Sequence, residues 1–173
     1  MRLSISREEI LDRQKQFYKR LQENNIDGAI LFSVTDVFYL TGFHFHPTER
    51  PMGFFVDPKQ KTHLFVPALE HEHTEEMAVI DYVHSYPEYP GVRHPMENLK
   101  DALVEAGFEN KTVAYDSNGY GSPMGYRGPT ISELINASEF RKISTWVEEM
   151  RFVKSPAEIE LIKESCRWGN LAH

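Results

Sequence analysis

The stretch DGAILFSVTDVFYLTGF, residues 27–43, contains the strongest fold signal in the chain. It opens with the unbroken apolar run AILF, residues 29–32. This run is too short for a helix, and an apolar run without polar alternation is typical of a strand buried on both faces. Turn-forming residues follow, and residues 38–40 then predict a second short strand that ends at Gly42. We expect these strands to deliver the next loop, residues 44–51, to one edge of a sheet.

A helix is predicted before this stretch, because Ser6 and Glu9 have the spacing of a capping box. Apolar side chains then recur at helical spacing, which predicts one apolar stripe. The stripe consists of Ile10, Leu11, Phe17, Tyr18 and Leu21. We expect it to pack on the sheet and to bury Ile30 and Phe32 of the central strand.

The rest of the chain alternates between predicted strands and helices. The predicted strands are residues 52–56, 63–66, 79–86, 112–115 and 140–144, with a hairpin loop at 57–61. The predicted helices are residues 70–78, 96–106 and 130–135, and two that begin after Thr145 and Ser155. Gly107 is expected just beyond the second of these helices, as its C′ residue. Such alternation is typical of an α/β layer fold with a mixed sheet.

Length and composition indicate an ordinary globular domain. The 173 residues are 40% hydrophobic and 26% charged, and the formal net charge of −7 argues against nucleic acid or an anionic membrane as partner. The single cysteine, Cys166, excludes an internal disulfide and favours the reducing cytoplasm. The N-terminus lacks the apolar core of a secretion signal. Apolar runs stay well below the roughly 20 residues that a membrane helix needs.

Several polar motifs are candidates for chemistry. His44 and His46 lie on one face of an extended segment, but two histidines without a third ligand do not predict a metal site. His71 and Glu75 share a helix face and are expected to form an exposed pair. The glycine-rich residues 119–128 depart from the dinucleotide pattern, which favours a surface loop over phosphate binding. Cys166 falls on the apolar stripe of the last helix and is expected to be buried and inert.

Two motifs resemble a known family. YLTGF at residues 39–43, followed by an arginine and by GFFVD at 53–57, is similar to the opening of the N-terminal domain of the creatinase/prolidase metallopeptidases. RFVKSPAEI at 151–159 resembles the segment that leads into that family's catalytic domain. The resemblance implies a mixed sheet of about six strands flanked by helices, described as ribonuclease-H-like. It implies this domain for residues 1–153, and for 154–173 the start of the helix into a catalytic domain that the chain lacks.

The resemblance also implies a function. The family binds a pair of divalent metal ions, such as Mn²⁺, through ligands that follow the segment at 151–159. This chain is therefore expected to hold no metal or other cofactor. We expect a non-catalytic N-terminal domain of a Xaa-Pro dipeptidase-like hydrolase, which joins its own catalytic domain, forms part of a homodimer and shapes the mouth of the substrate site.

One residue role carries over from the resemblance. In relatives an arginine after the strand-ending glycine reaches the substrate in the partner subunit's site. A gap-free count from Gly42 to Gly53 places Arg50 at that position, with His46 on the same loop as a second substrate contact. Glu49 stands beside Arg50 and could neutralise it.

Three alternatives stay open. The parent protein could be a creatinase-like enzyme or another amide hydrolase, since a fold does not determine a reaction. The chain could instead be a free-standing binding or dimerisation module. A small nucleotide-binding enzyme that uses the loop at 119–128 is the third.

Overall fold

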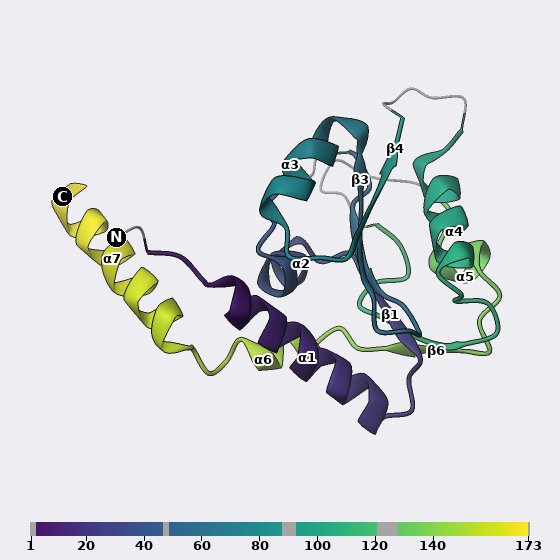
Figure 1. Ribbon diagram of the computed structural model, residues 1–173, viewed down its shortest axis with the longest axis horizontal. Coiled ribbons are helices and arrows are strands. Elements are labelled where there is room, and N and C mark those ends of the chain that lie inside the picture. Colours follow the sequence, from purple (N-terminus) through teal and green to yellow (C-terminus); the bar gives the residue numbers. More distant parts are fainter. Residues whose placement is uncertain (1–2, 47–48, 88–92, 121–127, 173) are drawn as a thin grey trace.

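The computed structural model describes residues 3–46, 49–87, 93–120 and 128–172 (Figure 1). Six strands form one sheet in the order β4-β3-β2-β1-β5-β6. Strand β2 is antiparallel to β1 and β3, whereas the other neighbouring pairs are parallel. The strands are β1 Gly28–Leu31, β2 Gly53–Val56, β3 Thr62–Pro67, β4 Tyr82–Tyr86, β5 Thr112–Tyr115 and β6 Glu139–Lys142. The predicted α/β fold with a mixed sheet is confirmed.

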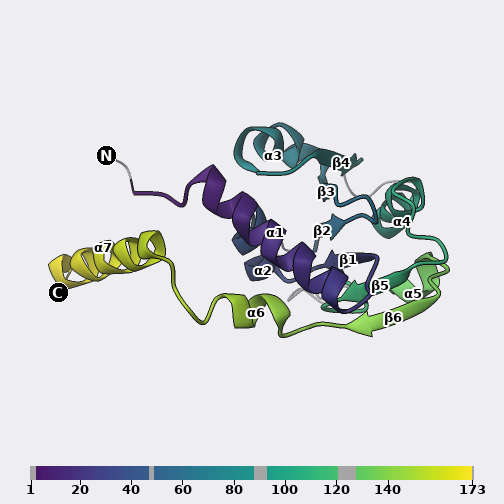
Figure 2. The ribbon, with the colours of Figure 1, turned by 60° about the horizontal axis from the view of Figure 1, so that its bottom comes forward.

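Helices cover both faces of the sheet (Figures 1 and 2). One face carries α1 Arg7–Glu23, α2 Val34–Thr41, the 3-10 turn Ala68–Glu70 with α3 His71–Met77, and α6 Trp146–Met150. The other face carries α4 Pro95–Glu105 and α5 Ile131–Leu134. Among the described residues, no helix is long and apolar enough to cross a membrane.

Two hydrophobic cores lie on the two sides of β1. Ala29 and Leu31 belong to the core under α1 and α2, whereas Ile30 and Phe32 belong to the core under α4 and α5. The expectation that Ile30 and Phe32 pack against the first helix is therefore wrong. Successive side chains of a strand point to opposite faces, and the stripe of α1 covers the face of Ala29 and Leu31.

Residues 38–40 form part of a helix, so the predicted second strand is also wrong. The Ser33 hydroxyl accepts a hydrogen bond from the Asp36 backbone N–H at 3.4 Å, which makes Ser33 an N-cap rather than a turn residue. Val37 and Leu40, three residues apart, are buried on one face of α2. The helix ends at Gly42, whose left-handed φ of 72° suits glycine. A helix, not a strand, therefore delivers the loop at 44–51.

Most other predicted elements are present with shifted bounds. Strand β4 begins at Tyr82 rather than at residue 79, and β6 begins and ends earlier than the predicted 140–144. Ser6 caps α1 as expected, and Gly107 follows α4 with a φ of 88°. In the predicted stripe of α1, Leu11 is exposed, and Arg13 is buried in addition to the apolar residues.

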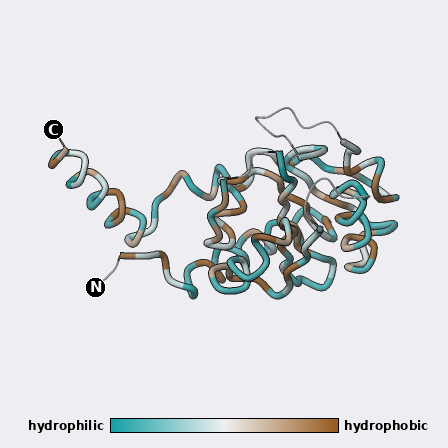
Figure 3. Tube along the Cα trace, turned by 90° about the horizontal axis from the view of Figure 1, so that it is seen from above, coloured by the Kyte–Doolittle hydropathy of each residue, from teal (hydrophilic) through white to brown (hydrophobic). Residues whose placement is uncertain are grey.

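Helix α7, Pro156–Ala172, projects from the body of the domain (Figures 1 and 2). None of its residues is buried. Hydrophobic and hydrophilic residues alternate along it (Figure 3), and Ile159, Ile162, Trp168 and Leu171 are exposed. Cys166 is exposed as well, so the expectation of a buried thiol is wrong.

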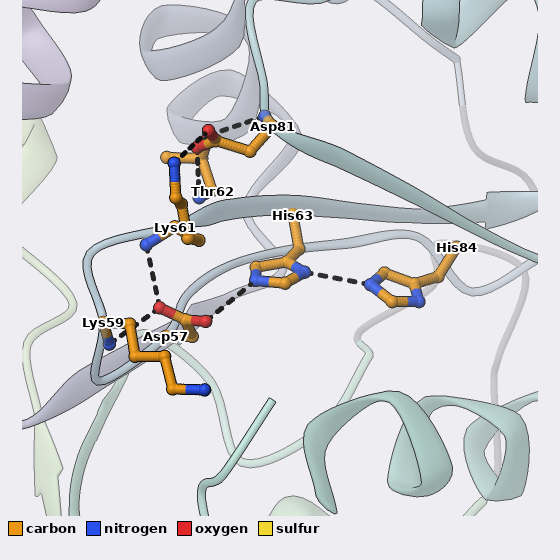
Figure 4. A network of polar contacts seen from close by, with 7 residues as sticks. All are labelled: Asp57, Lys59, Lys61, Thr62, His63, Asp81 and His84. Carbon is orange, nitrogen blue, oxygen red and sulfur yellow. Dashed lines mark hydrogen bonds and ion pairs between the residues drawn. The ribbon is translucent and has the colours of Figure 1, made fainter. Parts of the chain in front are cut away.

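A polar network joins β2, β3 and β4 at the end of the sheet where β1 begins (Figure 4). One Asp57 oxygen accepts the backbone N–H groups of Lys59 and Lys61 at 2.8 Å each, which closes the hairpin. The other lies 3.3 Å from Nε2 of His63, and Nδ1 of His63 lies 2.9 Å from Nε2 of His84. Since a carboxylate only accepts, His63 donates to Asp57 and accepts from His84.

Burial lowers the pKa of both histidines in this network. For His63 this effect outweighs the hydrogen bond and charge of Asp57, which raise its pKa. For His84 it outweighs the charge of Glu105. Neutral imidazoles suit the network, because a proton on both rings would place two N–H groups against each other between His63 and His84.

Phe32, directly after the central strand β1, gives the first prediction. Phe32 is 5% exposed, so Phe32→Ala should lower the free energy of unfolding by about 3–5 kcal/mol through lost burial and the cavity left behind. The matched control is Phe38→Ala, because Phe38 is 45% exposed and its loss should cost about 1 kcal/mol or less. Urea denaturation of both variants measures the difference. Equal costs would contradict this assignment of the core.

The histidine network predicts that the domain loses stability on mild acidification. Because the folded pKa values lie below the unfolded value of about 6.5, only the unfolded state gains protons as the pH first falls below that value. The stabilisation from the two neutral histidines should therefore be complete above about pH 6.5. The free energy of unfolding should decrease as the pH falls from there toward the lowered pKa values of the folded state. Urea denaturation across this range measures the decrease.

His84→Gln provides the comparison. Its amide N–H₂ can still donate to His63 but does not titrate. The variant should lose less stability than the wild type over the same pH range. Parallel curves for the two proteins would show that His84 does not contribute to the pH dependence.

Candidate functional site

The strongest candidate site lies at the edge of the sheet where β1 and β5 end and β2 begins. Strand β1 runs parallel to β5 and antiparallel to β2, so these three termini meet. The chain continues from β1 into α2, and the loop at 44–51 then leads from α2 back to the start of β2 at the same edge. In open α/β sheets, ligands bind outside the carboxyl ends of strands where neighbouring connections diverge. Arg50 lies at this edge.

Asp116, which follows β5, fixes the geometry of the edge. Its buried carboxylate accepts the backbone N–H of Phe32 at 2.9 Å and that of Ser33 at 2.7 Å. Burial raises the pKa of Asp116, and the hydrogen bonds from Phe32, Ser33 and Ser117 oppose that rise. These backbone contacts join the end of β1 to the end of β5, which gives Asp116 a structural role. Sequence reasoning missed it, although an aspartate directly after a strand was the available signal.

The end of the loop at 44–51 is anchored at this edge. The Tyr86 hydroxyl donates to the Pro51 carbonyl oxygen at 2.9 Å. Burial, together with the charge of Glu49, raises the pKa of Tyr120 to about 12. Glu49 Oε1 lies 3.8 Å from Arg50 Nε, so the predicted neighbour interaction is present. Glu49, Arg50 and Tyr120 therefore gather at one end of the sheet.

The two predicted histidines of the loop are exposed. His44 packs edge-on against Phe38, with ring centroids 5.6 Å apart. His46 is exposed in the same segment. Residues 47 and 48, which connect them to Glu49 and Arg50, lie outside the described residues.

Among the residues that the structure describes, the predicted histidine motifs do not gather into a metal cluster. His71 Nε2 lies 3.5 Å from Glu75 Oε1, which confirms the expected pair on α3. His73 instead faces Glu70, with 2.9 Å between Nδ1 and Oε2. In the described part of the chain, no group of three His, Cys, Asp or Glu side chains could hold a metal ion.

The Asp57–His63–His84 network lies at the opposite end of the sheet and is not a ligand set either. Asp57 and His84 bind opposite nitrogens of the same imidazole, so their atoms do not converge on one point. Sequence reasoning missed this network, because strand pairing brings the three residues together. Most of the predicted glycine-rich loop, residues 121–127, lies outside the described residues.

Comparison with known proteins gives a consistent result. The chain is 24% identical to the Xaa-Pro dipeptidase of Pyrococcus furiosus over 164 residues, which cover 93% of this chain and 40% of that protein. It is 25% identical to the Xaa-Pro dipeptidase of Lactobacillus helveticus, over 88% of this chain and 39% of that protein. The chain thus spans about 40% of the length of these relatives.

Solved structures show the same architecture. A proline dipeptidase chain from Streptococcus pneumoniae superposes with a TM-score of 0.65 at 28% identity, over 82% of this chain and 98% of that chain. The prolidase of Pyrococcus horikoshii has a TM-score of 0.68 at 23% identity, over 93% of this chain and 41% of that one.

The sequence pattern of the family described as Creatinase/Prolidase N-terminal domain matches residues 13–153. This range contains all six strands and the edge with Arg50. By the extent of that match, with the sheet and its helices arranged as in the solved relatives, the chain belongs to the Creatinase/Prolidase N-terminal domain family.

Proposed function

We propose that this chain is the non-catalytic N-terminal domain of a metal-dependent, Xaa-Pro dipeptidase-like hydrolase of the cytoplasm. Residues 1–153 would form the domain, and residues 154–173 would begin the helix that leads into a C-terminal catalytic domain. The observation that carries the proposal is the family match over residues 13–153 in a chain that spans 40% of a Xaa-Pro dipeptidase. That catalytic domain would hold the pair of divalent metal ions, such as Mn²⁺.

The polar groups of the described residues support a non-catalytic role. The Asp116 carboxylate accepts hydrogen bonds from backbone N–H groups. The Asp57 carboxylate accepts hydrogen bonds from the β2–β3 hairpin and from His63. Both carboxylates thus serve hydrogen bonds within the domain. The domain would contribute to a homodimer and to the mouth of the substrate site.

Arg50 is the residue best suited to contact a substrate. A guanidinium binds a carboxylate through two parallel hydrogen bonds, and a dipeptide carries a carboxylate at its end. Glu49 would hold the Arg50 side chain at the edge until a substrate carboxylate replaces it. In the intact dimer, Arg50 and His46 of one subunit would reach the active site of the other.

The first test uses the 173-residue chain by itself. We expect it to bind no stoichiometric Mn²⁺ or Zn²⁺ after dialysis and to hydrolyse no Xaa-Pro dipeptide, because the proposal places the ligand set in the C-terminal domain. Metal analysis and a dipeptide assay provide the measurements. A form that includes the C-terminal domain is the positive control. Metal binding together with turnover by the chain alone would refute the proposal.

The second test uses the form with the C-terminal domain. Arg50→Ala should lower kcat/KM for a dipeptide by about ten- to a hundredfold, because a charge-assisted contact contributes roughly 1.5–3 kcal/mol. Arg141→Ala is the matched control, since Arg141 is a partly exposed arginine on β6 and its loss should leave kcat/KM unchanged. Sedimentation measures whether the wild type and each variant form the proposed dimer. If both variants keep the wild-type kinetics, Arg50 does not contact the substrate.

A further inference from the structure

Helix α7 has little apolar support where it leaves the domain. A cavity of about 740 Å³ lies between the first turns of α7, helix α2 and the segment before α1. Ile5, Phe38, Met77 and Ile162 are among the residues that line it. Since the side chains line this space without filling it and no α7 residue is buried, apolar packing does not set the direction of the helix.

Glu158 joins the first turn of α7 to the body of the domain. One of its oxygens accepts the Ser155 backbone N–H at 2.8 Å, while the Ser155 hydroxyl accepts the Glu158 N–H at 3.1 Å. This is the reciprocal pattern of a capping box. The other oxygen lies 3.3 Å from the Arg13 guanidinium, and the two side chains are only 19% and 9% exposed.

Arg13 is a junction between three helices. Its guanidinium donates to Glu9 at 2.6 Å within α1 and to the Tyr39 carbonyl oxygen of α2 at 3.1 Å. It also lies over the Tyr39 ring, 4.1 Å from the centroid. A planar guanidinium can make all these contacts and still reach Glu158 of α7. These contacts hold Arg13 in place, so it gives Glu158 a fixed partner.

A second ion pair holds the segment before α7. Arg151 Nη1 lies 3.1 Å from Asp36 Oδ1 in the first turn of α2, and Asp36 is 5% exposed. The Tyr39 hydroxyl donates to the Met150 carbonyl oxygen at 3.2 Å beside it. Lys154 donates to the Arg151 carbonyl oxygen. The turn between α6 and α7 is therefore attached to α2, while the start of α7 is attached to α1.

We propose that the Arg13–Glu158 and Arg151–Asp36 pairs form a clamp that sets the direction in which α7 leaves the domain. Two separate attachment points restrict both the position of the helix start and its rotation about that point. The clamp concerns residues of this chain alone. One consequence rests on the proposed function: the clamp would determine where a catalytic domain that follows α7 lies relative to the Arg50 loop.

The test measures the distance from α7 to α1 by double electron–electron resonance. Cys166 is the only cysteine of the chain and is exposed on α7, so it takes one spin label without further change. Lys19→Cys on α1 takes the other, because the Lys19 side chain is 74% exposed. The wild-type background should give a single narrow distance distribution.

Glu158→Gln is the decisive variant, because glutamine keeps the capping box and removes the charge that pairs with Arg13. Glu160→Gln is its matched control: it removes the same charge from the same part of α7, and Glu160 pairs within that helix, with Lys163 at 2.7 Å. We expect Glu158→Gln to lose the single narrow peak and Glu160→Gln to retain it. Circular dichroism and thermal unfolding verify that each variant is folded.

Arg151→Gln and its control Arg167→Gln repeat the comparison at the second ion pair, since Arg167 pairs with Glu164 inside α7. The first should broaden the distribution and the second should not. Three outcomes would overturn the proposal: a broad distribution in the wild-type background, narrow distributions in both Glu158→Gln and Arg151→Gln, or equal broadening in the variants and their controls. This readout does not depend on enzymatic activity, so it can fail or succeed separately from the proposed function.

Discussion

Burial of β1 on both faces and pairing along both its edges constrain the rest of this domain. Its residues are fully buried, with β2 on one edge and β5 on the other. A Cβ at Gly28 would lie 2.7 Å from the Val56 carbonyl oxygen, so only glycine lets β2 come this close. Because β1 exposes neither face to water, helices have to cover the sheet on both sides. The two cores on either side of β1 are the result.

Two buried carboxylates close the ends of the sheet. Asp116 satisfies the backbone N–H groups that follow β1, and Asp57 satisfies those of the β2–β3 hairpin. A buried N–H group without a partner costs free energy comparable to a lost hydrogen bond, so each aspartate supports the strand ends around it. Both carboxylates therefore have structural roles, whereas the substrate contact of Arg50 belongs to the proposed function. The divided roles follow from where each strand ends.

The C-terminal segment is attached in a different way. Helix α6 packs through Val147 into the core under α1, whereas α7 has no buried residue. Its attachment depends on charged pairs that are partly shielded from water, Arg13 with Glu158 and Arg151 with Asp36. A charged pair requires defined geometry, while an apolar contact tolerates sliding. This difference explains how a helix with little packing can still have one direction.

The sequence alone determined the α/β class, the buried central strand, predicted at residues 29–32 and observed at Gly28–Leu31, the capping residue Ser6 and the family resemblance, because these depend on local runs, caps and spacings. Helix α2 was not predicted, because its short apolar run fits a strand as well as a helix. Recognising Ser33 as an N-cap is what distinguishes the two. Only the tertiary structure decided which core receives Ile30 and Phe32. It alone also revealed three polar contacts, which are Asp116 with Ser33, His63 with His84, and Arg13 with Glu158. The partners in the Asp116–Phe32 and Arg13–Glu158 contacts are 84 or more positions apart in the sequence. They meet because whole elements pack together, and no local pattern in a single sequence records such a contact.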